Sequence, residues 1–151
     1  MKQFRFPLQQ VLEVRDNIEK QRQGEFVVAG QDVTEAEQVF EEMLRLQKNS
    51  IVSYRKQQML NISPVESSQY FDYFCNLELQ MIQQLQTITE LKQEEEQKRE
   101  KLLEASQDKL MIEELEKKEK EQYHRLFQKR EQINIDDIST ITYNYRQKRQ
   151  R

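Results

Sequence analysis

Apolar or small side chains recur at alternating steps of three and four residues along two long stretches of the chain. This spacing matches the a and d positions of a heptad and predicts two long amphipathic helices. The first stripe contains Leu8, Leu12, Phe26, Ala29, Val33, Ala36, Phe40, Met43, Ser50 and Tyr54, with Arg15, Glu19, Arg22 and Gln47 in its gaps. The second contains Phe74, Leu77, Met81, Ile88, Leu91, Leu102, Ala105, Ile112, Tyr123, Leu126 and Ile133, interrupted by Gln84, Glu95, Lys98, Lys109, Glu116 and Glu119. Polar residues at so many stripe positions predict marginal stability and fraying toward the termini.

The break at Asn61-Ile62-Ser63-Pro64 predicts the turn of a hairpin. Ser63 can cap a helix N-terminus, Pro64 suits the first helical position, and Glu66 completes an S-x-x-E capping box. Because only a few residues join the two stretches, the helices must lie antiparallel. We therefore predict an all-α fold, a long antiparallel two-helix coiled-coil hairpin. It forms a single domain over residues 1–151, with helices at about 7–60 and 64–133 and a tip near 60–64.

The two predicted helices differ in length, about 80 Å against about 100 Å. If residue 60 faces residue 64, the numbers of facing residues add up to about 124, and the second helix overhangs beyond about residue 120. The overhang carries Tyr123, Leu126, Phe127 and Ile133. An apolar stripe without an internal partner predicts an external one.

Residues 134–140 mix β-branched and cap-forming residues, which weakens a helix. We therefore end the long helix near Ile133 and expect residues 134–151 to form a frayed or flexible tail, with a short further turn starting at Asp136 or Asp137 as an alternative. The last six residues hold four positive charges and no acid: Arg146, Lys148, Arg149 and Arg151. Such a tail can bind nucleic acid, an anionic membrane or an acidic protein surface, or it can serve only as a disordered solubilising segment.

The only two glycines, Gly24 and Gly30, lie inside the first predicted helix. Each lowers helix stability by about 1 kcal/mol relative to alanine. We favour tolerated substitutions in a very long helix over a hinge or a close helix crossing.

Composition and charge support a cytoplasmic coiled coil. Apolar residues make up 36% and charged residues 34% of the chain, with two glycines and two prolines, which is typical of coiled coils. A net charge of -3 with mixed signs gives the chain as a whole no reason to bind nucleic acid or anionic lipid. The lone Cys75 fits a reducing compartment, and no apolar run is long enough to span a membrane.

Few residues suggest chemistry. A two-helix hairpin offers no enclosed site for convergent groups, so we expect no enzyme, cofactor, metal or small-molecule substrate. His124 has no second metal-ligating residue at a suitable spacing, and we interpret it as a surface residue. We interpret Cys75, beside Phe74, as a small packing residue. The phosphate-binding, dinucleotide-binding and zinc-protease motifs are missing from the sequence.

An aromatic cluster near the tip is a sharper signal. It consists of Tyr54, Tyr70, Phe71, Tyr73 and Phe74. Five rings are more than one narrow seam can bury, so some must point outward, and aromatic residues are favoured anchors at protein interfaces. A locally thick core and an interface are both open at this point.

Several segments resemble the FliJ family, small coiled-coil proteins of the bacterial flagellar type III export apparatus. They are Phe4-Arg5-Phe6-Pro7-Leu8 with Val11-Leu12 and Arg15, the segment from Tyr70 to Leu77, and Glu131-Gln132 followed by Asp136-Asp137-Ile138-Ser139. The resemblance covers essentially the whole chain. It implies an antiparallel coiled coil, similar to the central stalk of rotary ATPases, whose terminal end inserts into the hexameric ring of the export ATPase FliI. It also implies contacts with the export-gate protein FlhA and with export chaperones, and a cytoplasmic location at the inner face of the cell membrane, reached only through partners.

The resemblance also assigns candidate binding residues. Those for the export gate are Met43, Leu46, Tyr54, Tyr70, Tyr73, Phe74 and Leu77. Those for the ATPase ring are Phe4, Phe6, Tyr123, Leu126, Phe127, Ile133, Arg146, Lys148, Arg149 and Arg151. Three alternatives share the same shape: the stalk of a virulence injectisome, a coiled-coil adaptor that binds nucleic acid through its basic tail, and a rod whose overhang pairs with a second copy.

Overall fold

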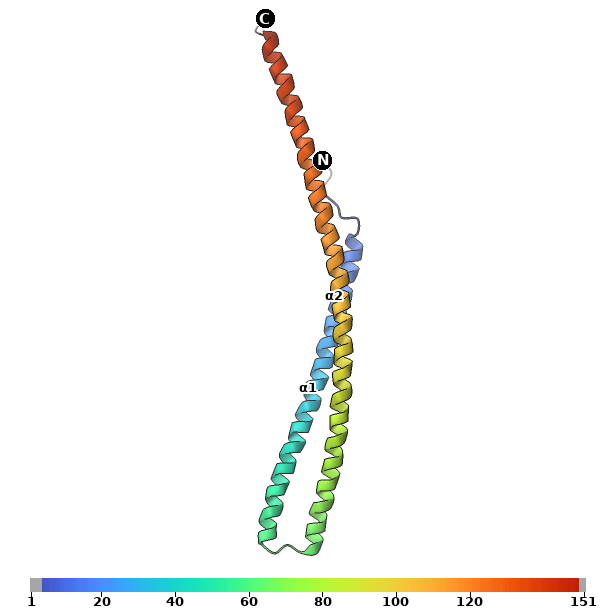
Figure 1. Cartoon of the computed structure of the whole chain (residues 1–151), viewed down its shortest axis with the longest axis vertical. Helices are drawn as coiled ribbons and strands as arrows, with labels where there is room; N and C mark the ends of the chain where they lie inside the picture. Colours follow the sequence, from blue (N-terminus) through green and yellow to red (C-terminus); the bar gives the residue numbers. More distant parts are fainter. Residues whose placement is uncertain (1–3, 150–151) are drawn as a thin grey trace. The chain divides into compact units, whose positions relative to one another are not determined.

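The computed structural model describes residues 4–149, and the side chains of residues 4–144. These residues form two long α-helices and no strand: α1 (Gln9–Met59) and α2 (Pro64–Arg149). The helices run antiparallel and pack against each other, which confirms the predicted helical hairpin (Figure 1). The contacts divide the chain into a terminal unit, residues 1–18 with 105–151, and a tip unit, residues 19–104. The assignment of the whole chain to one domain stays a prediction.

The turn between the helices forms as its residues predict. The backbone N–H of Glu66 donates to Ser63 Oγ (3.3 Å), and the backbone N–H of Ser63 donates to Glu66 Oε2 (3.0 Å), so the capping box is complete. Pro64 is the first residue of α2. At the other end of the turn, Asn61 has a φ of 57°, the left-handed conformation that commonly ends a helix and that asparagine tolerates.

In the tip unit, small and branched side chains form the centre of the seam. The buried residues are Ala29, Val33 and Ala36 from α1 and Leu77 and Ile88 from α2. Polar seam positions are satisfied as well, because Gln84 Nε2 donates to the backbone oxygen of Ala36 (2.9 Å). The seam is therefore narrow and holds hydrogen-bonded polar groups beside its apolar ones.

Glu25 sits at the edge of this seam among cationic and amide groups. Its carboxylate accepts hydrogen bonds from Arg22 Nη1 (2.9 Å) and Gln21 Nε2 (3.2 Å), and Lys98 Nζ from α2 lies 3.5 Å away. The bond from Arg22, then that from Gln21, holds the pKa of Glu25 below its ordinary value. A lowered pKa means that the charged form contributes stability at neutral pH, which is lost as the pH falls through the folded-state pKa.

The terminal unit pairs the start of the chain with the later part of α2. Phe6 and Ala105 are buried, and the ring of Phe4 lies 5.5 Å from that of Tyr123. Two ion pairs cross between the helices, Arg15–Asp108 and Asp16–Lys109, each at 2.7 Å. Each pair is partly exposed and contributes at most about 1 kcal/mol to stability. The two pairs therefore specify the register of α1 against α2 more than they stabilise the hairpin.

The register agrees with the prediction. The residue numbers of the cross-helix pairs Arg15–Asp108, Asp16–Lys109 and Glu25–Lys98 add up to 123, 125 and 123, and those of Glu37–Lys92, which reaches along the helices, add up to 129. The predicted sum was about 124 for a tight turn at 60–64. The seam residues from Leu12 to Tyr54 and from Phe74 to Tyr123, polar positions included, are all buried or half-buried.

The predicted helix ends need correction. α1 begins at Gln9 rather than near Pro7, because residues 7 and 8 form a turn closed by a hydrogen bond from Gln9 N to Phe6 O (3.3 Å). The predicted end of the second helix near Ile133 is wrong, because α2 continues to Arg149. The hydroxyls of Thr140 and Thr142 donate to the backbone oxygens four residues earlier (2.8 and 2.7 Å) and so remain inside the helical pattern. Threonine lowers helix stability relative to alanine by less than about 0.7 kcal/mol per residue, and this penalty is too small to break the helix.

The two glycines serve neither a turn nor a close helix crossing. Neither has a positive φ. A Cβ at Gly24 would meet no atom within 4 Å, and one at Gly30 would meet only Glu95 Oε1 at 3.4 Å, an ordinary van der Waals contact. Both positions fit the interpretation as tolerated glycines.

Gly24→Ala is expected to raise the free energy of unfolding by about 1 kcal/mol, because it removes backbone freedom from the unfolded chain and adds no clash. Urea unfolding followed by far-ultraviolet circular dichroism measures the change. Gly30→Ala is the matched control and should stabilise by the same amount or less, since its Cβ touches Glu95. A destabilised Gly24→Ala variant would show that the glycine has a conformational role.

Candidate functional site

Most of the aromatic cluster in the tip unit belongs to the seam. The ring of Tyr54 lies 5.2 Å from that of Tyr70 and 6.2 Å from that of Phe74, and Tyr73 lies 5.8 Å from Phe74. The hydroxyls of Tyr54 and Ser67 are 3.1 Å apart and bonded across the two helices. Edge-to-face rings at these separations stabilise a packed core. The rings of Tyr54, Tyr70 and Phe74 therefore tie α1 to α2, whereas the ring of Tyr73 packs on Phe74 of its own helix.

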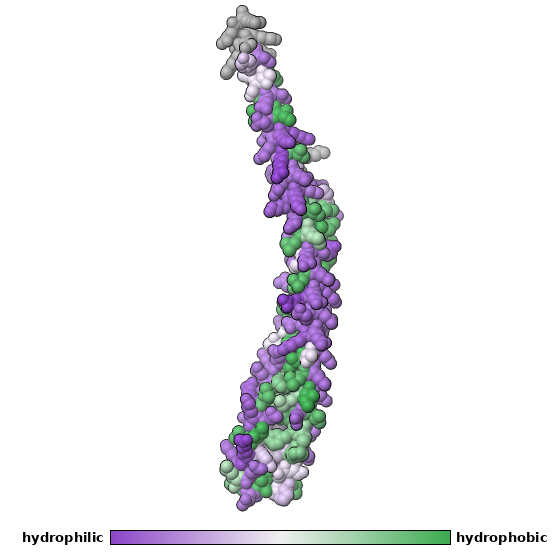
Figure 2. Space-filling view, viewed as in Figure 1, coloured by the Kyte–Doolittle hydropathy of each residue, from purple (hydrophilic) through white to green (hydrophobic). Residues whose placement is uncertain are grey.

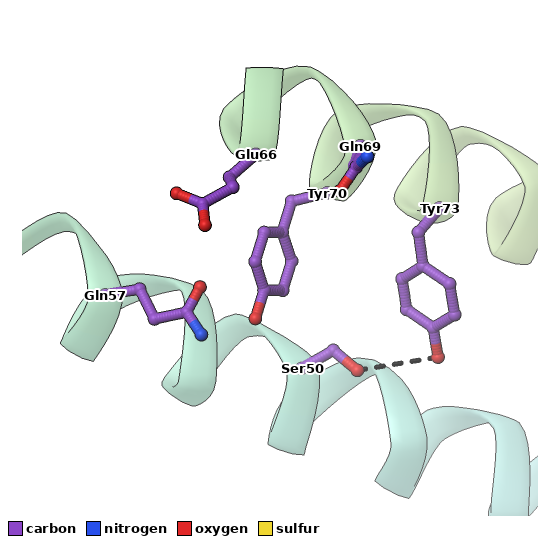
Figure 3. A pocket seen from close by; sticks show the side chains of 6 residues that line it. All are labelled: Ser50, Gln57, Glu66, Gln69, Tyr70 and Tyr73. Atoms are coloured by element: carbon purple, nitrogen blue, oxygen red, sulfur yellow. Dashed lines mark hydrogen bonds between the residues drawn. The ribbon is translucent and has the colours of Figure 1, made fainter. Parts of the chain in front are cut away.

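A polar groove runs beside these rings. Tyr70 and Tyr73 reach from α2 toward α1, and Ser50 Oγ donates to Tyr73 Oη at 3.5 Å (Figure 3). Gln57, Glu66 and Gln69 complete the lining, in a cavity of about 460 Å³. The lining residues supply hydroxyl, amide and carboxylate groups and no cationic side chain.

The candidate gate-binding residues divide between seam and surface. Met43, Tyr54, Tyr70 and Phe74 are half-buried in the seam, and Leu77 is only 5% exposed. Leu46 and Tyr73 are exposed. Most of the assigned residues therefore take part in the seam between the helices, and their assignment to the export gate stays a prediction.

A second apolar stripe lies outside the seam. We call Phe71, Cys75, Leu79 and Ile82 the outer stripe; all four are exposed, Phe71 by 69% of its surface. Successive members of the stripe are four, four and three residues apart, which is helical spacing. Each member follows a seam residue by one or two positions, so it lies about 100–200° around the helix from the seam. The interpretation of Cys75 as a packing residue is thus wrong. The stripe was not recognised in the sequence because the stronger seam pattern one residue away hides it, although its own spacing is the signal.

The N-terminal candidates are placed against α2. Phe6 is 5% exposed, and Phe4 is half-buried against Tyr123, so both belong to the core of the terminal unit. The prediction that Tyr123 lacks an internal partner is wrong for the same reason. Of the other three overhang residues, Phe127 is half-buried, and Leu126 and Ile133 are exposed. The side chains of Arg146, Lys148 and Arg149, and all of Arg151, lie outside the described residues.

Beyond Phe127, the described part of α2 continues as a helix whose side chains lie on the surface. Every side chain from 128 to 144 is exposed. This segment presents three further apolar residues, Ile135, Ile138 and Ile141, each exposed by more than half. Sequence reasoning missed them because it ended the helix at Ile133, although their three-residue spacing was visible. We call these three residues the isoleucine ladder.

The described residues offer few groups for other chemistry. Within residues 4–144, no three His, Cys, Asp or Glu side chains come together as a metal site. The ring of His124 lies 6.1 Å from that of Tyr123. Neither helix, over its described length, is apolar enough to cross a membrane.

The comparison with protein families gives one result. The profile of the family described as "Flagellar FliJ protein" matches residues 4–148. The chain belongs to the FliJ family. Comparisons with curated proteins and with solved structures give no match. Membership in the FliJ family supports a role in flagellar protein export and partners within the export machinery, and this family is structural and export-associated.

Two variants distinguish seam from surface in this FliJ-family chain. Leu77→Ala is expected to lower the free energy of unfolding by about 2–4 kcal/mol, because it leaves a cavity in the seam. Phe71→Ala should change it by less than about 0.5 kcal/mol, because the ring is exposed. Urea unfolding measures both, and a large loss in Phe71→Ala would place that ring in the core.

Proposed function

We propose that the chain acts as the non-enzymatic stalk of the export ATPase ring and as an escort that links the ATPase, the export gate and the chaperones. The observation that carries the proposal is the isoleucine ladder on a helical segment whose described side chains are all exposed. Isoleucines that no described residue covers favour a partner that covers them. Family membership indicates that this partner belongs to flagellar export.

The geometry of α2 suits a ring. Beyond Phe127 the segment is one helix, about 10–12 Å across with its side chains, a width that can enter a central opening. The ladder supplies apolar contact, and the four cations among the last six residues supply charge at the same end of the sequence. The core residues Phe4 and Phe6 instead hold the start of the chain against α2 and so brace the base of this segment.

We further propose that the gate contact lies on the outer stripe, with exposed Leu46 and Tyr73 as additional candidates. The stripe offers three large apolar side chains that no seam contact occupies. An extended row of apolar residues along one helix suits a partner helix or groove. The seam residues Tyr70, Phe74 and Leu77 then support the stripe from behind by fixing α2 on α1.

The triple variant Ile135→Ser, Ile138→Ser and Ile141→Ser is expected to weaken binding to the purified export ATPase at least about tenfold, because each isoleucine loses its apolar contact. Pull-down and surface plasmon resonance measure the binding. The matched control replaces Val14, Val27 and Val28, which are about equally exposed, with serine and should bind normally. Undiminished binding by the isoleucine variant, with helicity retained, would contradict the stalk proposal.

The double variant Phe71→Ser and Leu79→Ser is expected to lose most of its affinity for the cytoplasmic part of the export-gate protein, while ATPase binding stays normal. Calorimetric titration checks the first and pull-down the second. Val27→Ser with Val28→Ser is the control. If the gate still binds the outer-stripe variant, the contact lies elsewhere.

A further inference from the structure

The two most exposed large apolar residues of the described chain, Met59 and Leu60, lie at the hairpin turn, and the strongly exposed Val65 follows them closely in the sequence. Met59 is 87% exposed, Leu60 81% and Val65 68%. Hydrophobic residues are also concentrated over the part of the hairpin that includes the turn, as Figure 2 shows. Met59 ends α1, Leu60 lies in the turn and Val65 is the second residue of α2, and we call these three exposed residues the apolar knob. Exposed apolar side chains at a helix end can enter a soft apolar medium such as a lipid interface.

The last part of α1, after Met43, carries only positive charges. Between Met43 and Val65 the sequence has four cations and no acid: Arg45, Lys48, Arg55 and Lys56. None of them has an ion pair or side-chain hydrogen bond within the described part of the chain, in contrast to the cross-helix pairs Glu25–Lys98 and Glu37–Lys92. The first acid after the turn, Glu66, holds its carboxylate against the backbone N–H of Ser63. The turn thus combines free cations with free apolar side chains.

We propose that the hairpin turn inserts directly into the interface of an anionic lipid membrane. Met59, Leu60 and Val65 enter the boundary between headgroups and acyl chains, and Arg55 and Lys56, within a turn or so of Met59, meet the lipid phosphates. This contact goes beyond the proposed stalk function and replaces the expectation that the chain meets the membrane only through partners. An acidic protein would match the cations, but it would have to supply a pocket for the apolar knob.

The positions of the four cations along α1 distinguish insertion of the turn into the membrane from non-specific electrostatic attraction to its surface. Lys48 and Arg45 lie about 16 and 21 Å back along α1 from Met59, at 1.5 Å per residue. This is beyond the Debye length of about 8 Å at physiological salt. When the turn meets the membrane end-on, Arg55 and Lys56 therefore contribute to binding and the two more distant cations contribute little.

Insertion can be measured by tryptophan fluorescence, because the chain has no tryptophan and one introduced residue is then the only such fluorophore. Leu60→Trp in the full chain places one fluorophore at the turn, and Val27→Trp places one at a half-exposed position far along α1. Vesicles contain either phosphatidylcholine alone or an equal mixture of phosphatidylcholine and phosphatidylglycerol. With the mixture, the Leu60→Trp emission should shift to the blue and be quenched by brominated acyl chains. The Val27→Trp emission should neither shift in wavelength nor be quenched by the brominated acyl chains.

Charge variants on the Leu60→Trp background complete the test. Arg55→Gln with Lys56→Gln should lower partitioning into the anionic vesicles about 30-fold, since each cation near the surface contributes about 1 kcal/mol. Arg45→Gln with Lys48→Gln removes the same charge and should lower it less than about threefold. Circular dichroism checks that all variants keep their helicity.

Four results would overturn the proposal. They are an unshifted Leu60→Trp spectrum, equal partitioning into phosphatidylcholine alone, equal losses from the two charge pairs, and quenching of Val27→Trp. None of these measurements involves the ATPase or the gate, so the stalk function and the membrane contact fail or stand separately.

Discussion

Both helices depend on a seam that is one side chain wide. Three alanines, Val33 and hydrogen-bonded polar groups fill much of it, and no side chain of the described residues is fully buried. Each helix alone would expose its stripe to water, and a long polar helix gains little from intrinsic propensity. Stability is therefore spread along the seam in small increments, and local opening requires little free energy. A partner that binds one segment can reshape it without unfolding the rest.

The short turn keeps that seam aligned. Residues 60–63 leave almost no slack, and the capping box fixes where α2 starts. The pairs Arg15–Asp108 and Asp16–Lys109 still match although more than forty residues separate them from the turn on each helix. Partly exposed ion pairs stabilise weakly, but a shifted register would place like charges or apolar groups opposite them. Charge complementarity thus supports the alignment that the turn establishes.

Much of the fold could be predicted from the sequence, because a heptad pattern and a capping box are local signals. Even polar seam positions such as Glu95 and Lys98 are half-buried as their spacing predicted. The end of α2 could not be predicted, since the propensity penalties of residues 134–142 are small and the threonine hydroxyls bond back to the helix. The packing of Phe4 and Phe6 was missed for another reason. The packing of these two rings depends on the path of a non-helical segment, and a helical period in the sequence does not predict that path.

The candidate surfaces follow from how little a two-helix hairpin can bury. Each helix turns only one stripe toward its partner, so an apolar residue outside that stripe stays in water at a cost of about 25 cal/mol per Å². Scattered examples such as Val14 need no explanation. Phe71, Leu79 and Ile82 recur at helical spacing on one face, and Ile135, Ile138 and Ile141 recur on a segment whose described side chains are all exposed. A helical period outside the seam therefore distinguishes the residues that hold the hairpin together from those that we propose contact a partner.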